Sequence, residues 1–364
     1  TSQEPSLLGM LADAYEDYMA LRDEILEQPD VLQRWLDTSL DRVKEIAEVV
    51  RQRDVSYVFL AARGTSDHAG VYAQYLLGSR NRLPVALAAP SLFTMYPDSP
   101  RLANALVIGI SQSGQSPDIV SVIEEGRRQG AITLAITNHP DSPMSASAEL
   151  NLDIGAGAEL AVAATKTYTA QLLALAALSV ALAGDSREDV AALYRVPGAV
   201  AASLELEREA ERIAVKHAAL EHCVVLGRSY NYATAQEWAL KLKEMAYVFT
   251  DVYSTADFQH GPIAIVEEGF PILAVAPEGA VFSDMLSLLR RLRDEYKAEL
   301  VVISDSEEAL SLGHAGLCLP DGLPEWLTPI PAIVPAQLFC YHLTRAKGYD
   351  TEQPRTLRKV TLTH

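Results

Sequence analysis

Cysteine is scarce in this 364-residue sequence, which has only Cys223, Cys318 and Cys340. Three thiols without metal-ligand spacing exclude a disulfide framework and argue against a structural zinc site. We therefore expect a reduced, cytoplasmic protein in which the cysteines are ordinary core residues.

Basic residues are also few. Lys and Arg total 30 against 48 Asp and Glu, a net charge of −18. This balance argues against a general affinity for nucleic acid or an anionic membrane, since both need clustered basic surface. A bound anion must therefore be held locally by amides and hydroxyls, because the overall field of the protein repels it.

Long apolar runs and nucleotide motifs are missing as well. The longest apolar stretch, around residues 172–183, is too short and too rich in alanine to span a bilayer, and we find no signal peptide. The sequence has no GxxxxGK[ST] motif and no clean GxGxxG after a strand. We expect neither a membrane partner nor a nucleotide site.

One structural unit occurs twice. Residues 57–77 and 222–243 each combine a short apolar run, a turn of small residues containing Arg, and a helical pattern. The segments that follow, 105–138 and 270–305, both read strand, loop, amphipathic helix, strand. Val/Ile/Leu-rich strands alternating with such helices are typical of a parallel sheet covered on both faces. We predict an α/β protein with two tandem doubly wound domains.

This pattern divides the chain into five parts. We place a helical N-terminal arm at 1–48, the first domain at 49–190, a helical linker at 191–213, the second domain at 214–347 and a C-terminal tail at 348–364.

The stretch ISQSGQSPD, residues 110–118, follows a predicted strand in the first domain. Ligands of open parallel sheets bind at the carboxyl ends of strands, and Pro117 suits the first turn of a helix. The amides of that turn and the hydroxyls of Ser111, Ser113 and Ser116, with the Gln112 amide, would make an anion cradle. The alternative is a polar turn in which Ser116 merely caps the helix.

Gly64-Thr65-Ser66 occupies the same strand-end position in the preceding unit. Two hydroxyl-rich turns at one sheet edge favour a bound phosphate over an ordinary polar turn.

A second candidate site lies on the helix containing Glu237, Lys241 and Glu244. Their spacing of i, i+4 and i+7 places all three side chains on one face. They could form a solvated ladder of ion pairs. They could also form a row that moves protons, with the lysine tuning the carboxylates.

Two further segments have both an ordinary and a functional interpretation. His260 lies in a turn marked by glycine and proline, where a histidine is either merely exposed or chemically active. The short basic tail, which includes Lys359, is either a solvated end or a segment that docks through Val360 and Leu362.

Taken together, these segments resemble the sugar-isomerase (SIS) domain family, and in particular the isomerase half of glutamine–fructose-6-phosphate amidotransferases. The resemblance covers nearly the whole chain after its first forty or so residues. It rests on six motifs in order: Arg63-Gly-Thr-Ser66, Ser111-Gln-Ser-Gly114, Val162-Ala-Ala-Thr-Lys166, Glu237–Glu244, His260-Gly-Pro262 and Gln353-Pro-Arg355 with Lys359.

The resemblance implies a role for each motif position. The residues that match the sugar-phosphate pocket are Gly64, Thr65, Ser66, Ser111, Gln112, Ser113 and Ser116, with sugar contacts at Val162 and Arg358. Glu244 matches the base that moves a proton between C1 and C2, with Glu237 and Lys241 as its helix partners. His260 matches a ring-opening residue that reaches the neighbouring active site of a homodimer. Lys359 matches a lysine able to form an imine with a keto sugar.

The implied ligand is a phosphorylated hexose or hexosamine, and proton transfer between adjacent carbons needs no metal and no cofactor. The chain starts TSQEPSLLG and has its first cysteine at Cys223, so we expect it not to release ammonia from glutamine itself. Residues 65–70 and 115–118 resemble stand-alone SIS proteins that include a glucosamine-6-phosphate deaminase. We therefore predict a deaminase/isomerase that converts glucosamine 6-phosphate to fructose 6-phosphate and ammonia.

Three alternatives remain at this point. The chain could be a synthase-type isomerase that uses free ammonia or a separate glutaminase. It could be a deglycase or deaminase of another amino-sugar phosphate, with the choice made around Asp67-His68 and Tyr168. It could be a sensor that binds sugar phosphate without turnover, although such regulators usually carry one SIS domain and a DNA-binding module.

Overall fold

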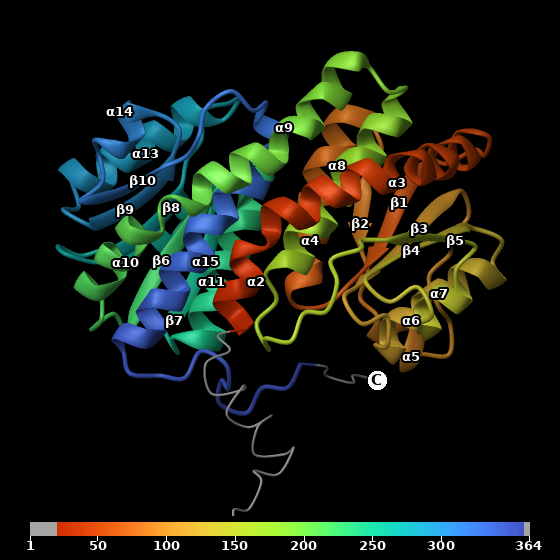
Figure 1. Cartoon of the computed structure of the whole chain (residues 1–364), viewed down its shortest axis with the longest axis horizontal. Helices are drawn as coiled ribbons and strands as arrows, with labels where there is room; N and C mark the ends of the chain where they lie inside the picture. Colours follow the sequence, from red (N-terminus) through yellow and green to blue (C-terminus); the bar gives the residue numbers. More distant parts are fainter. Residues whose placement is uncertain (1–19, 360–364) are drawn as a thin grey trace, which may run out of the picture.

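The computed structural model describes residues 20–359 and contains two α/β halves side by side, as Figure 1 shows. The expected docking of Val360 and Leu362 and the first nineteen residues of the arm lie outside this range. Strands of the first sheet are β1 (Tyr57–Ala61), β2 (Val85–Leu87), β3 (Ala105–Ser111), β4 (Ile132–Thr137) and β5 (Leu150–Asp153). Those of the second are β6 (His222–Gly227), β7 (Phe249–Ser254), β8 (Pro271–Val275), β9 (Glu299–Ser304) and β10 (Ala315–Cys318).

Both sheets are parallel throughout and have the same topology. The first has the order β2-β1-β3-β4-β5 and the second β10-β9-β8-β6-β7, which is the same order read from the other edge. The central strands β3, β4 and β9 are buried almost along their whole length, as their runs of Val, Ile and Leu predict. The predicted pair of doubly wound domains is confirmed.

Helices precede, connect and cover the sheets. The arm forms α2 (Ala20–Leu26) and α3 (Gln28–Arg51), and the connection between the domains forms α9 (Arg187–Leu204) and α10 (Glu207–Lys216). Domain 1 has α4 (Thr65–Asn81), α5 (Ser91–Thr94), α6 (Pro117–Arg128), α7 (Pro143–Ser147) and α8 (Lys166–Ala183). Domain 2 has α11 (Tyr230–Met245), α12 (Thr255–Gln259), η1 (Pro262–Ile265), α13 (Phe282–Asp294), α14 (Glu307–Leu310), η2 (Glu325–Leu327) and α15 (Pro329–Ala346).

One hydrophobic core runs through both domains, because α4 and α8 of the first meet α11 and α15 of the second. Tyr72 on α4 is fully buried and donates to the backbone oxygen of Trp326 at 2.7 Å, a polar bond across the domain boundary. Helix α8 is the one helix of the described residues long and apolar enough to cross a membrane, but 89% of it is buried inside the fold. Its apolar surface is therefore explained by its place in the core of domain 1.

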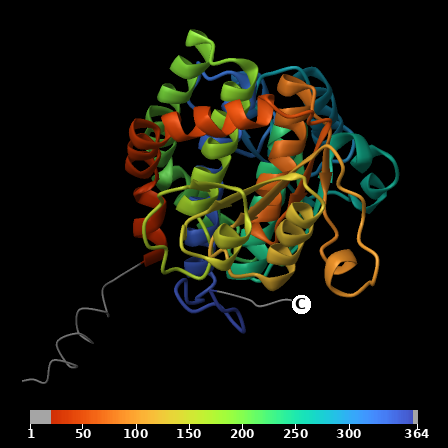
Figure 2. The same ribbon diagram turned by 90° about the vertical axis from the view of Figure 1, so that its right-hand side faces the viewer.

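The arm packs against its own chain. Helix α3 lies along α8 and α9, and its buried Trp35 donates from Nε1 to the backbone oxygen of Asp153 at 2.8 Å. In the two views of Figures 1 and 2, α2 runs down from α3 beside the C-terminal tail. The backbone N–H of Leu21 donates to the Glu352 carboxylate at 3.3 Å, so arm and tail are in direct contact.

The two domains differ in the loop after their third strand. In domain 1 this loop holds ISQSGQSPD, whereas in domain 2 it reads APEGAV, residues 276–281, without a hydroxyl. The backbone N–H of Ala280 donates to the Glu325 carboxylate at 2.9 Å. A β-carbon at Gly279 would lie 2.2 Å from Cδ of Glu325, so this side chain occupies the space in front of the loop.

Candidate active site

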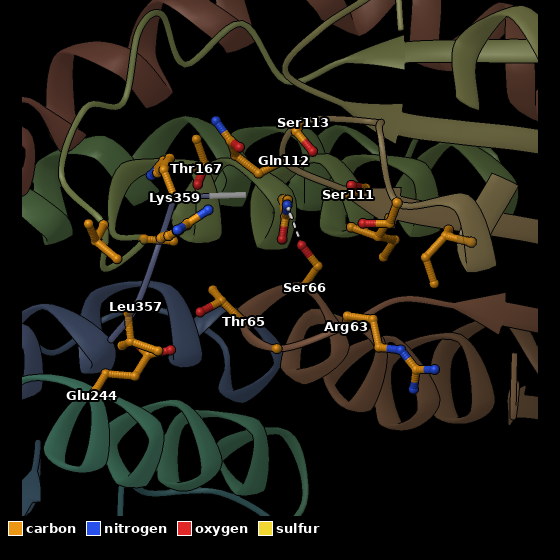
Figure 3. A pocket seen from close by; sticks show the side chains of 18 of the residues that line it. Arg63, Thr65, Ser66, Ser111, Gln112, Ser113, Thr167, Glu244, Leu357 and Lys359 are labelled. Atoms are coloured by element: carbon orange, nitrogen blue, oxygen red, sulfur yellow. Dashed lines mark hydrogen bonds between the residues drawn. The ribbon is translucent and has the colours of Figure 1, made fainter. Parts of the chain in front are cut away.

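A cavity of about 280 Å³ lies where domain 1, domain 2 and the tail meet, at the carboxyl end of the first sheet. Figure 3 shows side chains from all three parts around it. The sequence-predicted residues that line it are Gly64, Thr65, Ser66, Ser111, Gln112, Ser113, Ser116, Val162, Lys241, Glu244, Arg358 and Lys359. Glu237 and His260 do not line it.

The loop of residues 110–118 is shaped by one glycine. Strand β3 ends at Ser111, and the chain reverses through Gly114, whose φ is +62°. A β-carbon at Gly114 would lie 2.1 Å from Oγ of Ser142, so both the backbone angle and the close approach demand glycine. Helix α6 then begins at Pro117. Ser116 sits at its N-cap in extended conformation, but its side chain makes no capping hydrogen bond, so its hydroxyl does not cap the helix.

Three of the four serines that line the cavity accept hydrogen bonds from the protein. Ser111 Oγ accepts from the N–H of Gly114 at 3.0 Å, and Ser113 Oγ accepts from the N–H of Gln115 at 3.3 Å. Ser66 Oγ accepts from Nε2 of Gln171 at 3.0 Å. A hydroxyl that already accepts has its own proton left to donate. Such a wall suits an anion and is poorly suited to a cation.

Thr65 is bonded differently from its neighbours. Its Oγ1 donates to Oε1 of Glu237 at 3.0 Å and receives a bond from Nζ of Lys241 at 3.2 Å. It therefore belongs to the charged row on α11 as much as to the hydroxyl-lined wall.

The predicted row on α11 is a buried network and not a solvated ladder. Glu237 and Lys241 have side-chain exposures of 0% and 1%, and Lys241 Nζ lies 3.2 Å from Oε1 of Glu237. The same Nζ lies 2.7 Å from Oε2 of Glu244, which is 25% exposed and faces the cavity. Lys241 thus connects a fully buried carboxylate to one that ligands can reach.

Charge pairing outweighs burial in this row. Burial raises the pKa of Glu237, but Lys241 and then His68 hold that pKa below its ordinary value. Burial lowers the pKa of Lys241, but Glu237 and Glu244 together raise it well above its ordinary value. Near neutral pH, Lys241 is an ammonium that lies between Glu237 and Glu244.

The tail closes the cavity by an ion pair with domain 1. Lys359 Nζ donates to Oε2 of Glu159 and to the backbone oxygen of Ala161, both at 2.7 Å. Glu159 is fully buried and also accepts the N–H groups of Thr165 and Thr167 before and within the first turn of α8. Lys359 is thus held in an ion pair with a buried carboxylate, whereas imine formation with a sugar would need its free amine.

The other end of the tail is held on domain 2. The guanidinium of Arg355 lies 4.4 Å from the ring centre of Tyr247 and 4.9 Å from that of Tyr349. The backbone N–H of Arg355 donates to the Tyr247 hydroxyl at 2.8 Å. The segment between Arg355 and Lys359 therefore spans the boundary of the domains.

Several residues of the site were not predicted from the sequence. Arg63 lines the cavity and donates from Nε to the buried Asp118 at 2.9 Å. The Arg228–Asp284 pair, 3.0 Å apart, repeats this arrangement in domain 2. The occurrence of an arginine at the same place in both repeats is the sequence signal that could have identified Arg63. Glu159 and Gln171 had no such signal, because Lys359 and Ser66, which they contact, are distant in sequence, and Thr167 stands in no recognisable motif with its partner Glu159.

The structure places three other candidate residues outside the cavity. His260 is exposed at the C-cap of α12. Tyr168, which we had expected to influence the choice of substrate, is fully buried and donates to the backbone oxygen of Ala233 at 3.4 Å. His68 faces Glu237 and not the cavity.

The fold and the site together define a class of two-domain α/β proteins with a cavity between the repeats that is lined by hydroxyls, a lysine and a carboxylate. The SIS domain model matches residues 53–181 and 218–344, and the chain belongs to the SIS domain family.

Curated relatives agree with this assignment. A glutamine–fructose-6-phosphate aminotransferase (isomerizing) of Aquifex aeolicus is 34% identical over 349 residues, which cover 93% of this chain and 56% of that protein. The chain thus spans little more than half the length of the curated relatives that it matches.

Solved structures share the architecture. A protein of Silicibacter pomeroyi DSS-3, described as a candidate phosphosugar isomerase, has a TM-score of 0.82 and 34% identity, and the match covers 92% of this chain and 100% of that one. The C-terminal domain of a glucosamine-fructose-6-phosphate aminotransferase of Francisella tularensis has a TM-score of 0.83 at 28% identity, over 93% and 99% of the two chains. A glucosamine-6-phosphate deaminase of Thermotoga maritima, at 21% identity, shares the fold with a TM-score of 0.75, over 94% and 100%.

Proposed function

We propose that the cavity binds a phosphorylated hexosamine and converts it to a ketose phosphate by proton transfer, with glucosamine 6-phosphate giving fructose 6-phosphate and ammonia. The observation that carries the proposal is that hydroxyl donors and the Glu244 carboxylate face the same cavity. An aldose–ketose isomerisation needs a firmly held phosphate and a base within reach of two adjacent carbons.

The phosphate binds at the hydroxyl-lined end in this proposal. Ser66, Ser111, Ser113 and Ser116 donate their protons to its oxygens, and the N-terminus of α6 adds partial positive charge. Gln112 contributes its side-chain amide. Local donors of this kind are what a protein of net charge −18 needs in order to hold an anion.

Glu244 performs the proton transfer. In the open-chain aldose it removes the proton on C2, and the electron pair forms a C1–C2 double bond while the C1 carbonyl oxygen takes up a proton. Return of a proton to C1 gives an imine at C2. Water adds to this imine, and ammonia leaves to give the ketose. Lys241, whose Nζ lies 2.7 Å from Oε2 of Glu244, holds this side chain in position for the proton transfer.

A second copy of the chain completes the site. His260 is exposed and does not line the cavity of its own chain, so its proposed ring-opening role requires delivery from a neighbouring subunit. We accordingly propose a homodimer. A cytoplasmic location fits the free thiols of Cys223, Cys318 and Cys340 and the phosphorylated substrate.

The test is to incubate the purified protein with glucosamine 6-phosphate and to measure ammonia and fructose 6-phosphate together, with and without glutamine. Equal release of both products without glutamine supports the proposal. Product formation from fructose 6-phosphate only with an added nitrogen donor identifies a synthase-type isomerase. Release from galactosamine 6-phosphate or a fructosamine 6-phosphate alone changes the substrate. Binding with no turnover of any of these sugars contradicts catalysis and identifies a sensor.

A further inference from the structure

His68 joins the two domains at the inner end of the charged row. It lies on α4 of domain 1, three residues after Thr65, so both side chains project from one face of the helix. Its Nδ1 lies 2.7 Å from Oε2 of Glu237, on α11 of domain 2. Thr65 donates to the other oxygen, Oε1, at 3.0 Å.

Glu237 is therefore held on both oxygens. Its side chain is completely buried, and Oε1 also lies 3.2 Å from the ammonium of Lys241. A buried carboxylate is costly unless its oxygens are hydrogen-bonded. His68 is bonded to Oε2, and its side chain is itself 17% exposed.

We infer that His68 is a positioning residue, which holds Glu237 so that Lys241 stays between the two carboxylates and Glu244 presents its free oxygen to the substrate. The inference rests on the proposed function. It goes beyond that function because His68 touches neither the cavity nor the reacting atoms. The contacts run from His68 in domain 1 through Glu237 and Lys241 to Glu244. The position of the Glu244 carboxylate therefore depends on the contact between the two domains.

The charges around His68 also matter. The row of Glu237, Lys241 and Glu244 sums to −1 with a neutral imidazole and to zero with an imidazolium. Asp67 lies beside His68 on α4 and interacts with both His68 and Arg63. Burial raises the pKa of Asp67, while His68 and Arg63 act in the opposite direction.

The experiment compares H68A, H68F and H68N with wild type in glucosamine 6-phosphate deamination. An asparagine amide occupies nearly the position of Nδ1 and can still donate to Glu237, whereas alanine and phenylalanine cannot. We expect kcat to fall about 10- to 100-fold in H68A and H68F with KM changed less than about 3-fold, because the phosphate-binding hydroxyls are intact. H68N should stay within about 5-fold of wild-type kcat, because its amide can replace the hydrogen bond to Glu237.

The phenylalanine of H68F fills the volume of the imidazole ring, so H68F replaces H68A in the comparison if H68A does not fold. His222, exposed at the opposite end of β6, gives the control H222A, which should match wild type. Wild-type kcat within about 2-fold in H68A or H68F overturns the inference, as does an equal loss in H68N.

A readout without turnover separates this inference from the proposed function. In ¹⁵N NMR of histidine-labelled protein, a protonated Nδ1 of His68, hydrogen-bonded to Glu237, is expected. An unprotonated Nδ1 at neutral pH overturns the inference, whatever the activity. Absence of turnover in wild type, with Nδ1 protonated, rejects only the proposed function.

Discussion

Lys359 and Glu159 form a 2.7 Å ion pair although 200 residues separate them in the sequence. Glu159 is buried beside the start of α8, and Lys359 is the last described residue of the tail. This pair anchors one side of the tail over the cavity, and the stacking of Arg355 on Tyr247 anchors the other.

Replacing Glu159 by glutamine should release the tail. The glutamine oxygen can still accept from the N–H groups of α8, but its amide cannot pair with an ammonium. We expect trypsin to cleave after Arg358 or Lys359 at least about 3-fold faster in E159Q and the KM for sugar phosphate to rise. The exposed Arg53–Glu149 pair gives the control E149Q, which should change neither. Unchanged cleavage in E159Q would show that the pair does not hold the tail.

Alanine at Gly114 should disrupt the loop of residues 110–118. The new β-carbon would meet Ser142 at 2.1 Å, and the backbone has a φ of +62°. We expect a loss of more than about 2 kcal/mol in unfolding free energy and a weakened binding of fructose 6-phosphate. Gly130 has a φ of +79° but open space around it, so G130A should cost only about 1 kcal/mol and leave binding intact. Chemical denaturation and a thermal-shift titration measure both effects, and equal behaviour of the two variants contradicts this account.

Stability should depend on the protonation of Glu24, on α2. Burial raises its pKa from 4.5 to about 7, although it accepts bonds from the N–H groups of Leu160 and Ala161. Between pH 4.5 and 7 the folded protein keeps a proton that the unfolded chain releases. The free energy of unfolding therefore falls as pH rises through this window, by up to about 3 kcal/mol at this site.

The variant E24Q should lack this contribution. We expect E24Q to gain stability relative to wild type between pH 5 and pH 8, with unfolding followed by urea at each pH. E45Q, which removes an exposed carboxylate of α3, is the control and should not show the trend. A stability difference between E24Q and wild type that does not vary with pH would refute the protonation argument.

A dimer with shared sites should allow complementation. E244Q removes the base and H260N removes the proposed ring-opening group, so each variant alone should lose at least about 100-fold in kcat. Coexpression of the two chains with different tags should restore about one quarter of wild-type activity, because half of the dimers are mixed and each has one intact site. Activity of the purified mixed dimer no higher than that of either parent would place His260 and Glu244 in the same subunit or remove His260 from the mechanism.

Much of the fold could be predicted because its signals are local. The buried strands β3, β4 and β9 are continuous apolar runs, and the repeat shows in matching turns around Arg63 and Arg228. No local sequence pattern predicts the strand order, because it depends on which strands pair after each helical connection crosses the sheet.

The site was only partly predictable for the same reason. The loop of residues 110–118 could be identified because its hydroxyls and glycine are contiguous. The spacing of Glu237, Lys241 and Glu244 showed that the three side chains share one helical face. Whether they form a buried network or a solvated ladder depends on their burial, which results from the packing of α4 on α11. Glu159, His68 and Gln171 meet their partners over more than one hundred residues of chain, so no sequence window contains both members of a pair.

In domain 2, the side chain of Glu325 occupies the space in front of the loop of residues 276–281. This feature has a consequence for how such proteins diversify. The duplicated domain kept its scaffold without a hydroxyl-lined loop, and its helix α11 supplies Glu244 to the cavity of the other domain. In the proposed function, recognition of the phosphate and movement of the proton are thereby encoded in different repeats. Substitutions in one repeat can alter the sugar that is accepted while the acid–base helix in the other is inherited unchanged.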